Sequence, residues 1–416
     1  MSEGTDQAKR RDGFIAVREN ELIGAIGAPG DPMADVCAML DALLHHEAHA
    51  RLEALKALYD PLDPDAPELR RDQSPGALDA FEAALGEALA RANFEEMDPS
   101  DVQTQDATKL LTGLSIRPDA SGIRRIRYFA RGAHDREMTR SSWFGLIKRR
   151  IQTQVLRDVV VLVSFQGEDE IRRRDRRRLA RMRRGMRPGA TLLKHFREIA
   201  APELVTLHPG AKPAMLPVDQ FWLVAPAIVA GAPVMLNLLP AIGVIAAVLA
   251  AYFGAHGVIE DSDLKRALAA ISGLVAVGAF VMRQRLKFEA QSLRYQKQLA
   301  DTIYFRNLAN NAGVIDLLVG AGEDQDAKEA LLAYWTLRRS ERPLSKAEID
   351  RAAESFLRER FKLEINFEIF DALGKLERLG LVTRDGDSYQ AVPPADALAQ
   401  LDAAWDGLFH FSARRG

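Results

Sequence analysis

The chain has 416 residues, of which 47% are hydrophobic and 27% are charged, and its net charge at pH 7 is -2. This length allows two or three domains, and this balance excludes both a disordered tail and a wholly membrane-embedded bundle. A single cysteine, Cys37, leaves no possible disulfide within the chain, which excludes a disulfide-stapled secreted domain.

The first part of the chain is predicted to be acidic and helical. Residues 1–12 are polar and lack the apolar core of a signal peptide, so we expect a disordered N-terminus without a cleaved export signal. Residues 13–112 form the acidic helical region. Apolar positions at three- and four-residue intervals predict a helix over 33–59, and similar signals predict helices over 75–92 and 101–111.

Residues 113–216 are predicted to form a basic α/β region. Runs of β-branched and aromatic residues, separated by Gly, Pro, Asp or Ser, indicate a small and mostly antiparallel sheet. Its predicted strands cover 114–117, 123–131, 156–166 and 191–199. The run Val159–Phe165 is apolar on both faces and is expected to be the central strand. A short helical patch is predicted at 143–151.

Charge is strongly segregated between these two regions. Residues 1–112 carry 10 basic and 23 acidic side chains, and residues 113–200 carry 23 basic and 9 acidic ones. The two regions could fold against each other, or the basic region could face nucleic acid or an anionic lipid leaflet. Composition does not choose between these alternatives.

An arginine-rich tract, predicted to be an insertion at 172–187, holds ten arginines in sixteen residues. They are Arg172, Arg173, Arg174, Arg176, Arg177, Arg178, Arg181, Arg183, Arg184 and Arg187. A solvated loop is the plainest interpretation, and contact with anionic lipid headgroups is the functional one. Nucleic acid is the weakest alternative, because no aromatic side chain for base stacking lies between Phe165 and Phe196.

A membrane region is predicted at 217–286, because residues 221–259 contain no Asp, Glu, Lys or Arg. Three prolines interrupt its first half, which indicates an interfacial or broken helix over 217–231. Two transmembrane spans are expected to follow at about 233–257 and 264–282.

Basic residues after the second span predict that both termini are cytoplasmic, in a multi-pass protein of the bacterial inner membrane. The lipid bilayer is then the first predicted partner. Neither span contains a carboxylate, and Asn237 is the only amide, so anchoring is favoured over transport.

Residues 287–340 are predicted to form a cytoplasmic helical hairpin. The second span should continue as a long helical stalk, because an amphipathic stripe runs on without Pro or Gly until Gly313. The segment Ala309–Gly313 should end it, and a second helix is expected over 314–339.

The segments 293–313 and 328–335 carry a specific sequence pattern, and weaker patterns occur at 14–17, 126–132, 192–199 and 203–212. Together these segments resemble the transmembrane-protein-143-like family of bacterial and mitochondrial membrane proteins. The resemblance implies a two-span membrane protein with a domain of unknown function. Its signature residues, whose role is unknown, are Tyr304, Phe305, Asn307, Leu308, Asn310, Asn311, Gly313, Lys328, Glu329 and Tyr334. We favour helix capping by the amides and packing of Tyr304 between helices over a polar pocket.

Residues 341–416 are predicted to form a winged-helix-like module. Ser345 and Glu348 make a capping box for a helix ending near Phe361. A helix over 367–379, a hairpin around Asp385-Gly386-Asp387 and a last helix over 394–409 follow. Eight basic and ten acidic residues at 345–392 favour a protein partner over DNA.

The sequence predicts no enzyme, no cofactor and no metal site. His45, His46, Glu47 and His49 lack the spacing of a zinc-protease motif, so a solvated helix face is the preferred interpretation. Glu323, Asp324 and Asp326 could bind a divalent cation, although a solvated helix start is more common. No phosphate-binding loop or nucleophile elbow is present in the sequence.

The sequence thus predicts an α+β membrane protein: N-terminal helices, a small antiparallel sheet, a two-span transmembrane hairpin, a cytoplasmic stalk and a winged-helix-like module. The leading functional hypothesis is a non-enzymatic, membrane-anchored scaffold or adaptor, with a homo-oligomer or another protein as partner. The alternatives are a channel or transporter subunit formed by oligomerisation, and a membrane-tethered nucleic-acid-binding protein.

Overall fold

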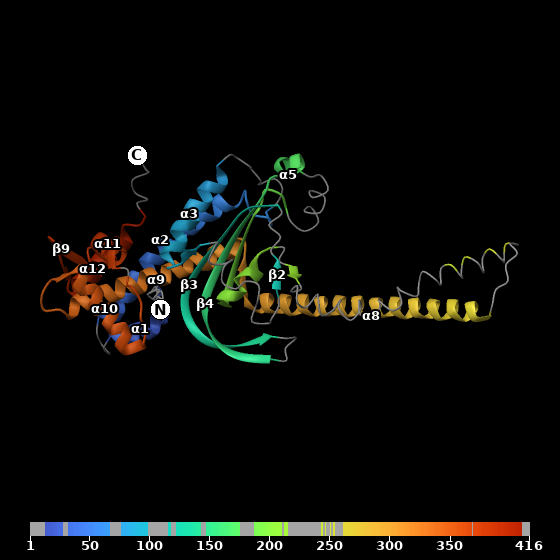
Figure 1. Cartoon of the computed structure of the whole chain (residues 1–416). Helices are drawn as coiled ribbons and strands as arrows, with labels where there is room; N and C mark the ends of the chain where they lie inside the picture. Colours follow the sequence, from blue (N-terminus) through green and yellow to red (C-terminus); the bar gives the residue numbers. More distant parts are fainter. Residues whose placement is uncertain are drawn as a thin grey trace, which may run out of the picture.

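The structure of the chain is a computed structural model. It describes residues 13–27, 32–66, 76–98, 115–117, 122–142, 147–174, 187–209, 212–214, 261–367 and 369–409, with four single positions between 243 and 253. The predicted helix over 101–111 lies outside these residues. Figure 1 shows a body of helices and sheet from which one long helix projects.

The N-terminal helices are α1 (Glu19–Ile26), α2 (Met33–Tyr59) and α3 (Ala77–Arg91). The helices predicted over 33–59 and 75–92 are therefore confirmed. The stripe of α2 that includes Leu40 and Leu44 is buried, as the three- and four-residue spacing requires.

A five-stranded antiparallel sheet has the strand order β1-β3-β4-β5-β7. Its strands are β1 (Glu95–Met97), β3 (Ile123–Ser142), β4 (Ile147–Phe165), β5 (Thr191–Ala200) and β7 (Asn307–Asn310). The strand β4 pairs with both β3 and β5, so the prediction that Val159–Phe165 is central is confirmed.

The hairpin of β3 and β4 extends well beyond the rest of the sheet. The strand β5 pairs with β4 only from Val155 onwards, whereas β3 and β4 remain paired as far as Ser142 and Ile147. The distal part is therefore a two-stranded ribbon. The helical patch predicted at 143–151 is wrong from Ile147 onwards, because these residues pair with β3 as a strand.

Both faces of the sheet are covered. On one face Phe129, Val160 and Leu193 pack against α2, α3 and α9 (Ala312–Arg339). The other face includes Val161 and Val163, which pack with residues of α5 (Glu168–Arg174) and of the 3-10 helix η2 (Ala201–Leu207). A separate two-stranded sheet joins β2 (Ser115–Arg117) and β6 (Lys212–Ala214).

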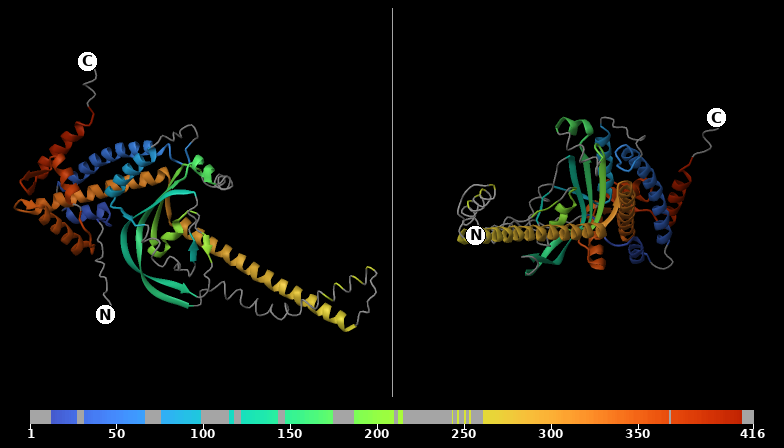
Figure 2. Two further views of the ribbon diagram at one scale, coloured as in Figure 1. Left: turned by 45° about the horizontal axis from the view of Figure 1, so that its top comes forward. Right: turned by 90° about the vertical axis from the view of Figure 1, so that its right-hand side faces the viewer.

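The projecting helix is α8 (Asp261–Arg306), which is 46 residues long. It ends at Arg306, and residues 307–310 then form the edge strand β7 beside β5. Asn311 follows with a positive φ of 50°, and α9 begins at Ala312. Figure 1 and the left view of Figure 2 show α9 leading away from α8 into the body, so the predicted antiparallel helical hairpin is wrong.

The predicted transmembrane hairpin is also wrong. Among the residues that the structure describes, no helix combines the length and apolarity that a membrane crossing requires. In α8 the uncharged run 267–282 has sixteen residues and lies between Arg266 and Arg283, whereas a span needs about 20. The regions 217–231 and 233–257 lie outside the described residues apart from single positions.

This finding overturns several further predictions. The multi-pass inner-membrane location with both termini inside is not supported, because it depended on the two spans. The same finding contradicts the membrane-anchored scaffold, the channel subunit and the membrane-tethered nucleic-acid binder.

The C-terminal elements occur in the predicted order. They are β8 (Leu344–Ser345), α10 (Lys346–Phe361), α11 (Ile369–Arg378), β9 (Val382–Asp385), β10 (Ser388–Ala391) and α12 (Pro394–Asp406). The capping box of Ser345 and Glu348 is present. The small sheet has the order β8-β10-β9, which places the hairpin beside the strand that precedes α10, as in a winged helix.

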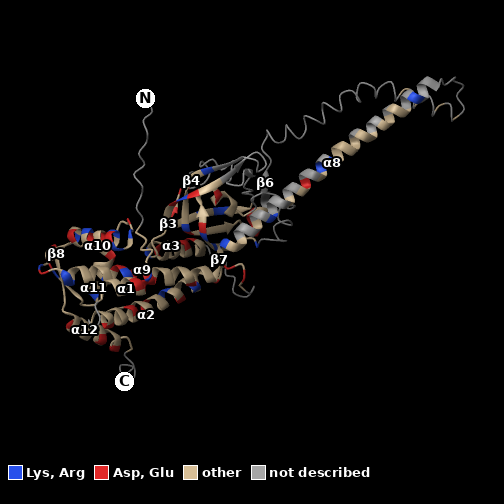
Figure 3. Ribbon diagram, turned by 90° about the horizontal axis from the view of Figure 1, so that it is seen from below, with Lys and Arg blue, Asp and Glu red and all other residues tan. Residues whose placement is uncertain are grey.

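The acidic and basic regions do fold against each other in part, which was one of the two alternatives. Arg125 and Arg127 of β3 both form ion pairs with the buried Glu82 of α3. Arg127 also pairs with Glu96 of β1 at 2.7 Å. Figure 3 shows both signs of charge on the sheet and on the helices of the body.

Candidate functional site

An extended N-terminal segment, Gly13–Val17, is held by side chains rather than by a strand ladder. The side-chain amide of Gln325 in α9 accepts a hydrogen bond from the Ile15 N–H at 2.8 Å and donates one to the Ile15 carbonyl at 3.3 Å. The Lys328 ammonium donates to the same carbonyl at 3.4 Å. Both polar groups of this buried backbone unit are therefore satisfied.

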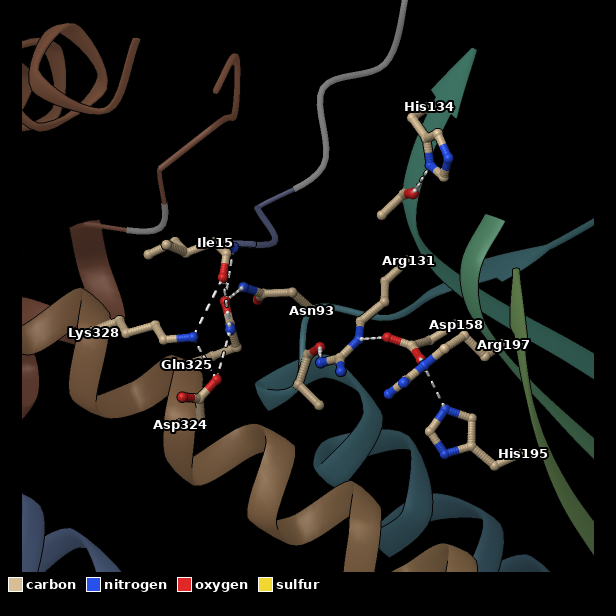
Figure 4. Close-up of polar contacts among 12 residues, drawn as sticks. Ile15, Asn93, Arg131, His134, Asp158, His195, Arg197, Asp324, Gln325 and Lys328 are labelled. Carbon is tan, nitrogen blue, oxygen red and sulfur yellow. Dashed lines mark hydrogen bonds and ion pairs between the residues drawn. The ribbon is translucent and has the colours of Figure 1, made fainter. Parts of the chain in front are cut away.

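Asn93 joins the same contacts from the end of α3 (Figure 4). Its amide donates to the Gly13 carbonyl at 3.0 Å and to the Glu329 carboxylate at 3.1 Å. Asn93 has a φ of 57°, a left-handed conformation that asparagine adopts more readily than most residues. The segment Gly13–Val17 is thus fixed between α3 and α9.

A row of charged side chains crosses the sheet next to this segment. Arg131 of β3 and Arg197 of β5 are the direct cross-strand neighbours of Asp158 in β4. Arg131 Nε donates to Asp158 at 3.1 Å, and His195 Nε2 lies 3.3 Å from the other carboxylate oxygen. Figure 4 shows both groups directed at Asp158.

The Arg131 guanidinium is also enclosed by aromatic rings. It lies 4.3 Å from the ring centre of Phe14 and 4.6 Å from that of Phe94. Its Nη1 donates to the Ala92 carbonyl at 2.8 Å. This cation–π sandwich connects the N-terminal segment to the charged row.

Burial alone would raise the pKa of Asp158. The His195 imidazole and the Arg131 guanidinium outweigh that effect, so this pKa lies below its ordinary value and the carboxylate is ionised. His195 is buried, and its Nδ1 atom neither accepts nor donates a hydrogen bond within the described residues. No hydroxyl or thiol contacts this pair among those residues, so the arrangement has the form of a structural ion-pair network.

A separate pocket of about 180 Å³ lies between α2, α3 and α9. Its walls are mainly apolar and come from Ala54, Leu55, Leu58, Ala84, Ala88, Val319 and Gly322. Four ionisable side chains also line it: Arg51, Glu87, Arg91 and Glu323. We call this space the helix pocket.

The two arginines of the helix pocket face one buried carboxylate. The Oδ2 atom of Asp326 lies 3.5 Å from Arg51 Nη2 and 3.9 Å from Arg91 Nη1. Asp326 is only 1% exposed, and this oxygen accepts no hydrogen bond from the described residues. Within the same residues, neither Arg51 nor Arg91 donates a hydrogen bond.

The helix pocket and the N-terminal segment share their framework. Arg91 lines the pocket, and Asn93, two residues later, holds Gly13. On α9, Glu323 lines the pocket while Gln325 holds Ile15. The end of α3 and one turn of α9 therefore position both the helix pocket and the segment Gly13–Val17.

Asp326, Glu329 and Asp371 have carboxylate oxygens within 4.8 Å of one another, a separation that could suit a metal ion. However, Lys375 Nζ lies 2.6 Å from Asp326 and 2.7 Å from Asp371. An ammonium group from the protein thus already pairs with two of the three carboxylates, so we interpret this cluster as an ion-pair network.

Another acidic group surrounds Glu19, the first residue of α1. Burial, followed by the charges of Asp41 and Asp324, raises the pKa of Glu19 to about 7. Lys328 opposes this effect, and Glu323 adds to it. Glu19 therefore titrates near neutral pH, four residues from the clamped Ile15.

The signature residues from the sequence do not form one site. Tyr304 and Phe305 are 76% and 82% exposed, so Tyr304 is not packed between helices. Leu308 and Asn310 are exposed, Asn307 is half-buried, and Gly313 lies in the first turn of α9. Asn311 alone among the amides is buried.

Asn311 connects three elements. Its side-chain oxygen accepts from the Tyr59 hydroxyl at 3.2 Å and from the Leu193 N–H at 3.3 Å. Its amide donates to Asp65 at 2.5 Å. Three other signature residues, Lys328, Glu329 and Tyr334, are buried in α9, and the Tyr334 hydroxyl donates to the Val392 carbonyl at 2.9 Å.

Most of the arginine tract lies outside the described residues. Arg172, at the end of α5, is exposed and forms an ion pair with Glu168, and Arg187 donates to the Ala66 carbonyl at 3.5 Å. These two contacts do not test the predicted lipid interaction, which stays a prediction.

The candidate metal ligands of α2 are directed to different partners. His45 contacts Glu323 at 2.8 Å, His46 packs edge-on against Phe409, and Glu47 forms an ion pair with Arg378. Glu323, Asp324 and Asp326 lie in the middle of α9 rather than at a helix start. Asp324 is paired with Lys328 at 2.6 Å.

Sequence reasoning did not find the helix pocket or the clamp around Ile15. Arg51, Arg91, Asn93 and Gln325 belong to no motif, and their partners are distant in the sequence. The weak similarities at 14–17 and 126–132 were the only signal, because they contain Ile15 and Arg131.

Residues 156–313 match a family model described as a protein of unknown function, DUF3754. This match covers less than half of the chain and includes Asp158, His195 and Asn311. Neither the curated proteins nor the solved structures gave a match. The resemblance to the transmembrane-protein-143-like family stays a prediction, since the matched family carries neither that name nor a function.

Proposed function

We propose that this protein is a non-enzymatic binding protein that holds a small, mainly apolar molecule in the helix pocket. One observation carries the proposal: three helices line a partly open, mainly apolar pocket of about 180 Å³, and two guanidinium groups lie at one end of it. A concave apolar site with a few convergent polar groups is the usual form of a small-molecule site.

The size of the pocket limits the ligand. An engineered apolar cavity of about 150 Å³ binds benzene, so this pocket suits a molecule with one ring or a short chain. The walls from Leu55, Ala88 and Val319 supply apolar contact. A ligand with seven or eight heavy atoms could then bind with about -4 kcal/mol or better, or a dissociation constant of about 1 mM or below.

The walls of the pocket are well supported. Leu55 of α2, Leu85 and Leu89 of α3, and Val319 of α9 belong to one buried apolar cluster that packs onto the sheet. The ligand would therefore enter a preformed space, which avoids much of the cost of ordering a site on binding.

The test is a binding measurement with toluene on the full chain, by ligand-observed NMR and calorimetry. Ala88→Phe should fill the pocket and reduce toluene binding at least tenfold. Ala90→Phe is the matched control, because Ala90 is an exposed residue of the same helix and does not line the pocket. If both variants bind toluene as the wild type does, or if the wild type binds none, the proposal is wrong.

A further inference from the structure

The polar end of the helix pocket combines unused donors with a buried negative charge. Arg51 and Arg91 are 34% and 40% exposed in their side chains and donate no hydrogen bond within the described residues. Asp326 lies behind them and is almost fully buried. A ligand group placed here meets both signs of charge.

The sum of charges around the pocket decides which ligand fits. The lining contributes two positive charges, from Arg51 and Arg91, and two negative ones, from Glu87 and Glu323. Asp326 and Glu329 behind the lining add two negative charges, while Lys375 and Asp371 next to them cancel each other. The total is about two negative charges.

An anion gains little from this arrangement. To accept from both guanidiniums it must approach Asp326 Oδ2, which lies within 4 Å of each of them, and the two negative charges repel. It must also lose its hydration against apolar walls. A cation placed at this end of the pocket is repelled by the two guanidinium groups.

A neutral hydroxyl or carbonyl avoids both penalties. Its oxygen can accept from either guanidinium, neither of which donates a hydrogen bond within the described residues. Because a neutral group does not meet the repulsion from Asp326 that an anion meets, this bond should add affinity.

We infer that Asp326 makes the helix pocket selective for a neutral molecule with one hydrogen-bonding group, such as a small aromatic alcohol. This inference rests on the proposed function. It assigns Asp326 as the residue that determines charge selectivity, by acting on Arg51 and Arg91 from behind.

Four probes of nearly equal size test it on the full chain: toluene, benzyl alcohol, benzoate and benzylamine. In the wild type, benzyl alcohol should bind about threefold tighter than toluene and at least tenfold tighter than benzoate or benzylamine. In Asp326→Asn the preference for benzyl alcohol over benzoate should fall about tenfold. Asp316→Asn is the matched control, because Asp316 is a half-exposed residue of the same helix paired with Lys56 instead.

The outcomes separate the two proposals. If none of the four probes binds, the proposed function fails. If toluene binds but benzoate equals or exceeds benzyl alcohol in the wild type, only the inference fails. Should Asp326→Asn not fold, the double variant Arg51→Met with Arg91→Met replaces it. Loss of both donors should lower benzyl alcohol to the affinity of toluene, and an unchanged ratio would overturn the role of this end of the pocket.

Discussion

Gln325 and Ile15 are 310 residues apart in the sequence, yet the side-chain amide of one pairs with both backbone polar groups of the other. This pairing replaces the partner strand that an extended segment would otherwise need. It fixes the start of the described chain onto α9, next to the helix pocket.

Gln325→Ala should destabilise the protein by about 1–3 kcal/mol, because it leaves the buried Ile15 N–H without its hydrogen bond. Urea unfolding measures this change, and hydrogen exchange should show loss of protection at the Ile15 amide. Gln152→Ala on the exposed ribbon is the control and should change stability by less than about 0.5 kcal/mol. An unchanged exchange rate at Ile15 would contradict the clamp.

Arg131→Met should cost about 3–5 kcal/mol, because it removes the guanidinium that donates to the buried Asp158 carboxylate and leaves only His195 and the more distant, exposed Arg197 beside it. The double variant Arg131→Met with Asp158→Asn should lose less than the sum of the two single variants. Glu289→Gln, which breaks the exposed pair with Arg285 in α8, provides the contrast and should cost under about 0.5 kcal/mol. Additive single effects would show that the buried pair does not couple.

Asp158 also predicts a loss of stability in acid. Its pKa is lowered in the folded protein, so its contribution is present above the unfolded value near 3.8 and is lost as the pH falls through the folded value. Asp158→Asn should therefore flatten the decrease of unfolding free energy below pH 4. The comparison is a set of urea unfolding curves for both proteins from pH 2.5 to 5.

Glu19 predicts the opposite dependence near neutral pH. Its pKa is about 7 when folded and near 4.5 when unfolded, so between these values the folded state holds the extra proton. The free energy of unfolding should fall as the pH rises from 4.5 to 7, by about 1 kcal/mol after solvent screening. Glu19→Gln should be more stable than the wild type at pH 8 and equal to it at pH 4.

The control for Glu19 is Glu21→Gln, an exposed position on the same helix. It should leave the slope between pH 4.5 and 7 as in the wild type. Parallel curves for the wild type and Glu19→Gln would refute the raised pKa.

Asn311→Asp keeps both acceptor contacts of the side chain but removes its donor to Asp65. Two carboxylates then face each other at hydrogen-bond distance, which should cost about 1–3 kcal/mol at pH 7 and less at pH 4. Asn310→Asp is the neighbouring exposed control and should be nearly neutral. Thermal unfolding at both pH values distinguishes the two variants.

The sequence predicted the elements whose signals are local. The spacing of Val36, Leu40 and Leu44 gave α2, and the doubly apolar run at 159–165 gave the central strand. The capping box of Ser345 and Glu348 gave the start of α10. Each of these signals acts within a few residues, so no knowledge of distant partners is needed.

Elements that depend on distant partners were missed. Residues 307–310 continue a helical pattern, yet they form β7 because β5 offers an open edge at Lys194–Phe196. A short helical patch was predicted at 143–151, but from Ile147 onwards these residues pair with β3 as a ribbon. The uncharged stretch at 221–259 led to the transmembrane prediction, which depended on composition alone.

The site was the least predictable part. Lys328 and Glu329 are charged and would be read as solvent-facing, but both are buried because Ile15 and Asn93 supply their contacts. Arg51 and Arg91 come from two helices and meet only at Asp326. The spacing of these three residues in the sequence does not predict their contact.

Helix α9 packs against both the N-terminal helices and the C-terminal module, which the sequence had assigned to separate domains. Leu331 and Leu337 share one apolar cluster with Leu40 of α2 and with Leu357 and Leu376 of the C-terminal module. Dividing the chain at residue 340 would thus split one continuous hydrophobic core and expose apolar surface on both fragments. The parts of the chain before and after residue 340 are therefore expected to unfold in one thermal transition. Neither fragment expressed alone should remain monomeric at high concentration.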